Sequence, residues 1–147
     1  MTASRDIVVA CARSWLGTPY HHAARVKGAG CDCLTLVASV YEEAGIVDRI
    51  EIPHYPPDWH LQRGAERYMN GVLEHAREVE GPAPGDLALW RFGRCFSHGA
   101  IVVRWPLVIH AYLGSCVRLE DAEAARWLAT DGGRARPRRF FSPRAFG

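Results

Sequence analysis

The sequence predicts an α+β fold, with helices in its first half packed on an antiparallel sheet formed by its second half. Up to Pro82, apolar residues recur at three- and four-residue steps, which is the helical period. After Gly85, short runs rich in Val, Ile and aromatic residues alternate with turns, which is typical of strands. Helices followed by strands favour an α+β arrangement. The length of 147 residues predicts a single domain spanning residues 1–147.

Composition and charge exclude several classes of protein. An apolar content of 48% is too high for a disordered chain, and no apolar run approaches the ~18 residues of a membrane-spanning helix. The N-terminal stretch has one early basic residue and Asp6 within its apolar part, so we expect no signal peptide and synthesis in the cytoplasm. With 18 basic and 16 acidic residues, the chain is too balanced for a nucleic-acid partner.

Two helices are predicted in the first 45 residues. The first covers residues 5–16 and ends at Gly17, because one apolar stripe stops there. A glycine-containing loop over 17–31 follows. The second helix runs from Cys33 to Ala44 and ends at Gly45; it is apolar almost all round, so we expect it to be central.

The middle of the chain is predicted to hold an irregular loop and a third helix. Residues 46–60 contain Pro53, Pro56 and Pro57, which exclude a regular element. Residues 60–79 have the spacing of an amphipathic helix.

The second half is predicted to consist mainly of short strands, with one short helix over 120–129. The strands are expected at residues 87–90, 98–103, 107–113, 116–119 and 138–141.

Cys33 is the candidate nucleophile among five cysteines whose odd number and irregular spacing do not suggest a disulfide framework. It stands in the first turn of the central helix, where backbone N–H groups and the helix dipole are expected to stabilise a thiolate. The alternative is an apolar core cysteine that happens to begin a helix.

His98 and His110 are the candidate base and its orienting partner. If the strands 98–103 and 107–113 form a hairpin centred on Arg104, the two histidines stand opposite each other on one face. A thiol nucleophile needs such a base and a group that holds it, so the pattern predicts a Cys–His–His site. A slip of one residue would separate the rings, and two satisfied core histidines are the alternative.

Two further interpretations remain open at this stage. Asp32 is either the N-cap of the central helix or a negative group that holds a substrate amine beside the nucleophile. The residues Cys31, Cys33, Cys95 and His98 could instead ligate a structural zinc ion.

Four motifs together resemble the NlpC family of bacterial papain-like cell-wall cysteine peptidases. They are the stretch GTPYHHAARVKGAGCDCLTLV at 17–37, Pro-Gly-Asp-Leu at 84–87, His-Gly-Ala-Ile at 98–101 and Ile-His-Ala at 109–111. The resemblance implies a papain-like fold and the hydrolysis of amide bonds in peptidoglycan stem peptides, between D-glutamate and the diamino acid, without a cofactor.

The resemblance also implies a role for each matched residue. Cys33 corresponds to the nucleophile, His98 to the base and His110 to the residue that orients it. Tyr20 corresponds to a tyrosine that lines the site, and Asp32 to the aspartate that meets the free amine of the stem peptide.

Finer features resemble one branch of this family, the peptidases of phage tails and gene transfer agents. These are Gly-Cys-Asp-Cys-Leu at 30–34 and His-Tyr-Pro-Pro-Asp-Trp at 54–59. They imply phage tail or particle proteins as partners and action on the cell wall.

The chain departs from the family at Leu34 and Thr35, where Ser-Gly is usual, and at residues 21–23, where a basic residue and paired glycines are usual. Two alternatives to peptide hydrolysis remain. One is another thiol acyl-transfer reaction, and the other is a non-catalytic protein, either a tail structural subunit or a zinc-stabilised module.

Overall fold

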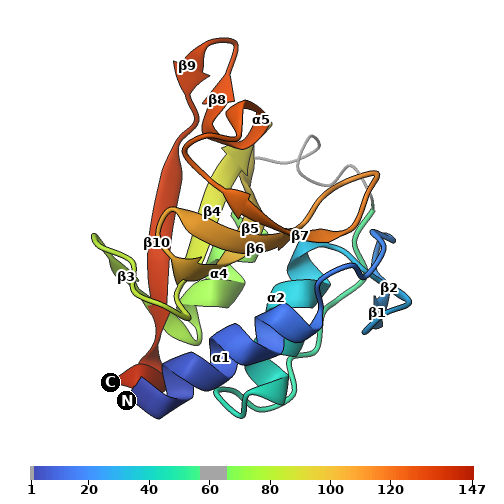
Figure 1. Ribbon diagram of the computed structural model, residues 1–147, viewed down its shortest axis with the longest axis vertical. Helices are drawn as coiled ribbons and strands as arrows, with labels where there is room; N and C mark the ends of the chain where they lie inside the picture. Colours follow the sequence, from blue (N-terminus) through green and yellow to red (C-terminus); the bar gives the residue numbers. More distant parts are fainter. Residues whose placement is uncertain (1, 57–65) are drawn as a thin grey trace.

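The computed structural model describes residues 2–56 and 66–147, and its centre is an antiparallel sheet of six strands (Figure 1). The strand order is β3-β10-β4-β5-β6-β7, and every neighbouring pair is antiparallel. The α+β class predicted from the sequence is therefore confirmed. The strands are β3 (Ala76–Val79), β4 (Leu87–Phe92), β5 (Cys95–Arg104), β6 (Leu107–Ala111), β7 (Val117–Asp121) and β10 (Arg138–Pro143).

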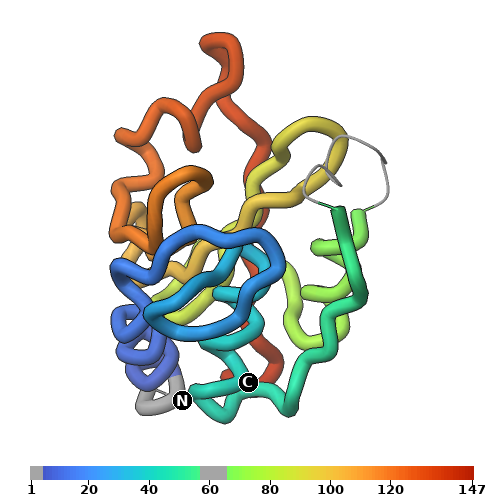
Figure 2. The backbone as a smooth tube through the Cα atoms, turned by 90° about the vertical axis from the view of Figure 1, so that its right-hand side faces the viewer, coloured from blue at the N-terminus to red at the C-terminus, as the bar shows by residue number. Residues whose placement is uncertain are grey.

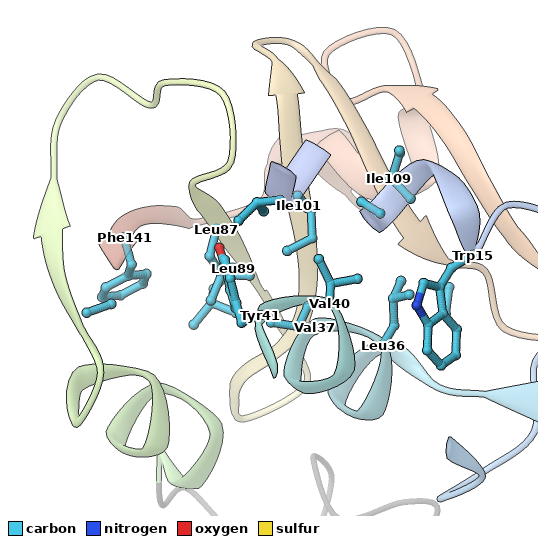
Figure 3. Close-up of a cluster of buried hydrophobic side chains, with 14 of the residues drawn as sticks. Trp15, Leu36, Val37, Val40, Tyr41, Leu87, Leu89, Ile101, Ile109 and Phe141 are labelled. Atoms are coloured by element: carbon cyan, nitrogen blue, oxygen red, sulfur yellow. The ribbon is translucent and has the colours of Figure 1, made fainter. Parts of the chain in front are cut away.

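Two helices, α1 (Thr2–Ser14) and α2 (Cys33–Glu43), pack on one face of this sheet. Both were predicted, and both are followed by glycines with positive φ, Gly17 at 87° and Gly45 at 73°. Figure 3 shows α2 lying over the strands, with its apolar side chains directed at β4, β5 and β6. The core contains Trp15, Leu36, Val37, Val40, Tyr41, Leu87, Leu89, Ile101, Ile109 and Phe141, all buried.

The other face of the sheet carries a second, smaller apolar cluster. Its centre is formed by alternate residues of the same strands, including Trp90, Val102 and Val108. The short helix α5 (Arg126–Ala129) covers this cluster through Leu128, and the small hairpin of β8 (Thr130–Asp131) and β9 (Arg134–Ala135) follows it. The sheet is thus covered on both faces.

The helix predicted over 60–79 is confirmed at Arg67–Leu73 and wrong at Ala76–Val79. Residues 57–65 lie outside the described residues, α4 (Arg67–Leu73) is helical, and Ala76–Val79 forms strand β3. The side chain of Ala76 is buried while the next two are exposed, and β3 pairs along β10. Pairing with a distant strand overrode a weak local helical pattern.

The helix predicted over 120–129 is shorter than expected. Strand β7 continues to Asp121 because Val108 and Leu107 of β6 pair with Glu120 and Asp121. The carboxylate of Asp121 then accepts hydrogen bonds from the backbone N–H groups of the next turn, which delays the helix to Arg126.

The loops around the start of α2 complete the fold. Residues 17–31 contain a two-stranded hairpin of β1 (Arg25–Val26) and β2 (Gly30–Cys31). The segment 46–56 has no regular structure and runs along the side of the molecule, as Figure 2 shows. No helix in the described part of the chain is long and apolar enough to cross a membrane.

Candidate active site

The N-terminus of α2 is fixed by a capping box. Oδ1 of Asp32 accepts hydrogen bonds from the backbone N–H groups of Leu34 at 3.0 Å and Thr35 at 2.9 Å, while the Thr35 hydroxyl accepts from the N–H of Asp32. The N-cap interpretation of Asp32 is thereby confirmed. Thr35, where the motif that the chain resembles usually has glycine, is the second half of this box.

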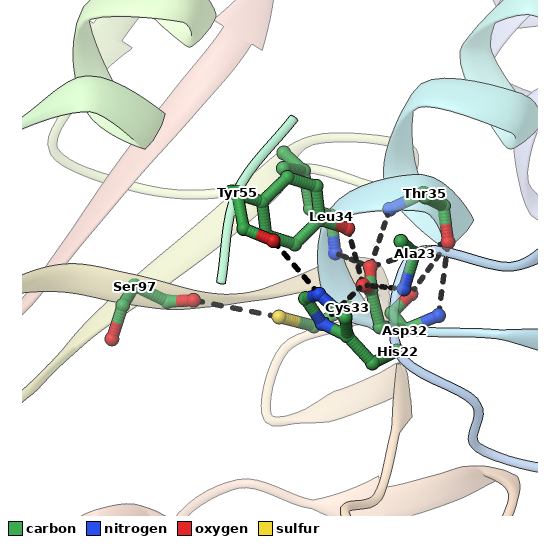
Figure 4. A network of polar contacts seen from close by, with 8 residues as sticks. All are labelled: His22, Ala23, Asp32, Cys33, Leu34, Thr35, Tyr55 and Ser97. Carbon is green, nitrogen blue, oxygen red and sulfur yellow. Dashed lines mark hydrogen bonds and ion pairs between the residues drawn. The ribbon is translucent and has the colours of Figure 1, made fainter. Parts of the chain in front are cut away.

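The second carboxylate oxygen of Asp32 holds two loops against the helix. Oδ2 accepts the backbone N–H of Ala23 at 2.8 Å and the hydroxyl of Tyr55 (Figure 4). His22 lies beside them, with Nε2 2.8 Å from the carbonyl oxygen of Tyr55 and Nδ1 3.9 Å from Oδ2 of Asp32. Asp32 is only 2% exposed, and each of its carboxylate oxygens accepts at least two internal hydrogen bonds. A substrate amine would have to displace one of them.

The thiol of Cys33 lies against the backbone of β5. It donates to the carbonyl oxygen of Ser97 at 3.4 Å (Figure 4). The backbone N–H of Gly99 is close enough to lower the pKa of the thiol. Val102 donates its N–H to the carbonyl oxygen of Asp86, just before β4, so residues at odd positions such as Ile101 and Gly99 direct their backbone groups to the other edge of β5. The pairing of β5 with β6 extends only to Ile101, which leaves that edge open for the thiol.

Gly99 is required at this position by close packing. A Cβ atom at residue 99 would collide with the hydroxyl of Tyr68, which donates to the carbonyl oxygen of Cys33 at 3.1 Å. The glycine of the His-Gly-Ala-Ile motif therefore allows a tyrosine from α4 to hold the nucleophile's backbone.

The charge state of Cys33 differs from the sequence-based expectation. Burial, followed by the negative charge of Asp32, raises the pKa of the thiol to about 12, although the N–H groups of Gly99 and Cys33 itself act to lower it. The helix N-terminus is therefore outweighed, and the resting cysteine is a neutral thiol rather than a stabilised thiolate.

The two histidines are neighbours, but not in the predicted register. Ile101 pairs with Ile109, which sets His110 opposite Ala100 rather than opposite His98. The turn is the cause, because Arg104 pairs with Leu107 and the chain reverses at Trp105 and Pro106 instead of at Arg104. The irregularity between Val102 and Arg104 takes back one position, so the net difference is two. The shift moves the partner by two positions, so both rings stay on one face, and Nε2 of His98 lies 3.0 Å from Nδ1 of His110.

Both imidazoles are neutral at pH 7. Burial lowers the pKa of His110 to about 4, with a smaller effect from the charge of Arg118. Burial, His110 and Arg136 together lower the pKa of His98 well below its ordinary value. The ring of Trp127 covers the pair, stacked on His110 at 5.2 Å and edge-on to His98 at 5.7 Å between centroids.

The thiol and the imidazoles approach β5 from different faces of the sheet. His98 and His110 share the face of Ala100 and Val108, whereas α2, with Cys33, packs on the opposite face. The sulfur contacts the backbone of Ser97 and Gly99, the residues on both sides of His98. Nδ1 of His98 has no hydrogen bond to any residue that the structure describes. The Cys33 thiol therefore lies beside the backbone of β5 at residue 98, whose imidazole has an unbonded Nδ1 within the described part of the chain.

Tyr20 belongs to the same group of residues. It bridges to Cys31 through the backbone, and burial together with the nearby Cys33 and Asp32 raises the pKa of its hydroxyl. Tyr20, Asp32 and Cys33 thus lie together at the start of α2, and the His98–His110 pair belongs to the strand whose backbone the Cys33 sulfur contacts. Sequence reasoning missed Tyr55, Tyr68, His22 and Trp127; the aromatic loop around residue 55 was the only signal that pointed to any of them.

The zinc alternative is not supported by the arrangement of side chains. Within residues 2–56 and 66–147, no three His, Cys, Asp or Glu side chains are placed to hold a metal ion together. Cys31, Cys33, Cys95 and His98 therefore do not form one ligand set.

The fold matches solved structures of NlpC/p60 domains at low sequence identity. No protein-family model matches the chain, and no curated protein matches it in sequence. The NlpC/p60 domain of the peptidoglycan hydrolase SagA is similar at 22% identity with a TM-score of 0.58, over 93% of this chain and 96% of that one.

Two longer proteins contain the same fold. NlpC1 from Trichomonas vaginalis is similar at 17% identity with a TM-score of 0.64, over 96% of this chain and 44% of that one. A lipoprotein-like NLP/P60 family protein from Staphylococcus aureus is similar at 20% identity with a TM-score of 0.60, over 92% of this chain and 41% of that one. The chain thus has the papain-like NlpC/p60 fold and spans less than half of these two longer proteins.

Proposed function

We propose that the chain is a cysteine peptidase that hydrolyses amide bonds in peptidoglycan stem peptides. The observation that carries the proposal is the thiol of Cys33 lying against the backbone of the residues that flank His98, while His98 is held by His110 at 3.0 Å. The shared fold with a domain of the peptidoglycan hydrolase SagA supports the choice of substrate class.

The proposed mechanism starts from a neutral thiol and a neutral imidazole. The sulfur turns from the Ser97 carbonyl around the open edge of β5, where Nδ1 of His98 accepts its proton as it attacks the substrate carbonyl carbon. His110 stabilises the imidazolium that forms. The N–H of Cys33, in the first turn of α2, is available to the developing oxyanion. The imidazolium then protonates the leaving amine, and a water molecule activated by His98 hydrolyses the thioester.

Finer parts of the proposal rest on the motif resemblance. We propose cleavage between D-glutamate and the diamino acid, and a particle-borne enzyme that acts on the cell wall with phage tail or gene-transfer-agent proteins as partners. Part of the loop motif that supports the second statement, residues 57–59, lies outside the described residues.

Digestion of purified muropeptides, followed by mass spectrometry, tests the proposal. The expected products are the two fragments from the D-glutamate bond; amide or ester exchange products would instead indicate a different thiol acyl transfer. Cys33→Ala and His98→Ala should lower turnover at least about a thousandfold, whereas His110→Asn should retain a measurable fraction.

A matched thiol serves as the control. Cys11 is also partly buried but lies on α1, so Cys11→Ala should keep the wild-type rate. Full activity in Cys33→Ala, or no cleavage by a correctly folded wild-type chain, would contradict the proposed function.

A further inference from the structure

The starting point is a buried nitrogen on the orienting histidine. His110 is 0% exposed, and its Nδ1 faces His98, but its Nε2 has no hydrogen-bond partner among the described residues. Nε2 faces the carboxylate of Glu120, whose Oε1 lies 3.9 Å away. On β7, Glu120 pairs with Val108 of β6, so its side chain shares a face with His110.

The hydrogen bond between the two rings can be made in two ways. Since both rings are neutral, each carries one proton, and either His98 or His110 is the donor. The proposed mechanism needs a bare Nδ1 on His98, which puts the His98 proton on Nε2, where it is donated to Nδ1 of His110. The proton of His110 must then be on Nε2, pointing at Glu120.

Without an acceptor, that arrangement would be the less stable one. A buried N–H that finds no partner is costly, so the rings would exchange roles. His110 would then donate from Nδ1, and His98 would carry its proton on Nδ1, the position that must be bare to take the thiol proton.

We propose that Glu120 is a positioning residue: its carboxylate accepts the Nε2–H of His110 and so selects the pair of tautomers in which His98 can act as a base. This inference rests on the function proposed above. The gap of 3.9 Å is longer than a direct hydrogen bond, but Glu120 is 17% exposed on its side chain, and a small rotation or one bridging water closes it.

Neighbouring side chains hold both partners in place. Nε of Arg118 lies 3.5 Å from Oε1 of Glu120, and its guanidinium stacks on the ring of Tyr112 at 4.7 Å, which keeps the carboxylate beside β6. Trp127 stacks on the ring of His110, so the imidazole cannot rotate away from the carboxylate without losing that contact.

The test reads the tautomers directly and does not require activity. Nitrogen-15 labelling of histidine in the whole chain, with two-bond proton–nitrogen spectra at pH 7, reports which ring nitrogen carries the proton. We expect the Nε2–H form for both His98 and His110 in the wild type and in Glu120→Gln, which keeps an acceptor oxygen. In Glu120→Ala both rings should shift towards the Nδ1–H form.

Glu123→Gln is the matched control, because Glu123 is 54% exposed on its side chain and lies just beyond β7. It should leave both tautomers unchanged. A wild-type spectrum with Nδ1–H on His98, or a Glu120→Ala spectrum identical to wild type, would overturn the inference.

Kinetics on muropeptides supply the second readout. Glu120→Ala should lower kcat at least about tenfold with KM little changed, and Glu120→Gln should restore most of it. If the tautomers shift as expected but the wild type cleaves no stem peptide, the proposed function fails while the role of Glu120 in the histidine pair stands. If the wild type is active and Glu120→Ala has the same kcat, Glu120 has no role in catalysis.

Discussion

The two sides of the site differ in how completely their polar groups are satisfied. On the nucleophile side, each oxygen of Asp32 accepts two internal donors, and these fix the start of α2, the loop at Ala23 and the segment at Tyr55. On the base side, His110 is fully buried, yet Nε2 has no partner within the described part of the chain. The nucleophile is therefore held by the same hydrogen bonds that stabilise the fold. In the histidine pair, Nε2 of His110 depends on the proposed acceptor Glu120, and this contact would decide which ring nitrogens carry the protons.

The largest expected effect concerns the thiol on the well-satisfied side. Burial and Asp32 raise the pKa of Cys33 to about 12. At any pH below that value, each increase of one pH unit should therefore raise its thiolate fraction tenfold. Alkylation of Cys33 by iodoacetamide, followed by peptide mass spectrometry, should therefore accelerate about a thousandfold between pH 7 and pH 10.

The same chain in denaturant is the control for this measurement. Its cysteines should approach their ordinary pKa, so labelling should level off above about pH 9. A rate for folded Cys33 that is already at its plateau at pH 7 would mean a preformed thiolate–imidazolium pair and would remove the contrast between the two sides.

The next effect concerns acid and the base side. In the folded chain the pKa of His110 is lowered to about 4, while in the unfolded chain the ring binds a proton near its ordinary 6.5. The stabilising contribution is complete above pH 6.5 and is lost as the pH falls towards 4, because the unfolded state takes up the proton first. The loss amounts to about 3 kcal/mol from His110 alone.

Urea unfolding at pH 7 and pH 4 measures this contribution. His110→Asn should lose less stability on acidification than the wild type, by about that amount, whereas the exposed His75→Asn should behave as the wild type does. Equal acid sensitivity of His110→Asn and the wild type would show that the buried ring is protonated as easily as a free one.

The sequence predicted the elements of the site better than the contacts between them. The helix start at Cys33 and the strands carrying His98 and His110 follow from local patterns, because capping and alternation act over a few residues. The predicted register of the hairpin was wrong because the turn lies at Trp105 and Pro106 instead of at Arg104, and the irregularity before it leaves no sequence signal. Tyr68 and Trp127 come from elements that reach the site only through tertiary packing, so no local pattern could assign them.

A smaller effect is expected when the satisfied side is broken. Asp32→Ala removes the N-cap and leaves the N–H groups of Leu34, Thr35 and Ala23 without their acceptor. We expect a loss of about 2–3 kcal/mol in the free energy of unfolding, measured by urea denaturation. Asp48→Ala, at an exposed position, should change it by less than about 0.5 kcal/mol. A similar small change in both variants would mean that Asp32 is not what fixes the nucleophile side.

The smallest effect concerns the backbone at Ala23, where the nucleophile side carries strain. Ala23 has a φ of 61°, the left-handed region that favours glycine, and this conformation points its N–H at Asp32. The strain costs about 1 kcal/mol, and Ala23→Gly removes it, but the added freedom of the unfolded chain costs about 0.5–1 kcal/mol, so we expect a net stabilisation of up to about 0.5 kcal/mol. Ala24→Gly, one residue further at an ordinary φ, should instead destabilise by about 0.5–1 kcal/mol. If both glycine variants destabilise equally in urea unfolding, Ala23 is unstrained. The usual glycines at this part of the family motif would then need a reason other than the bond to Asp32.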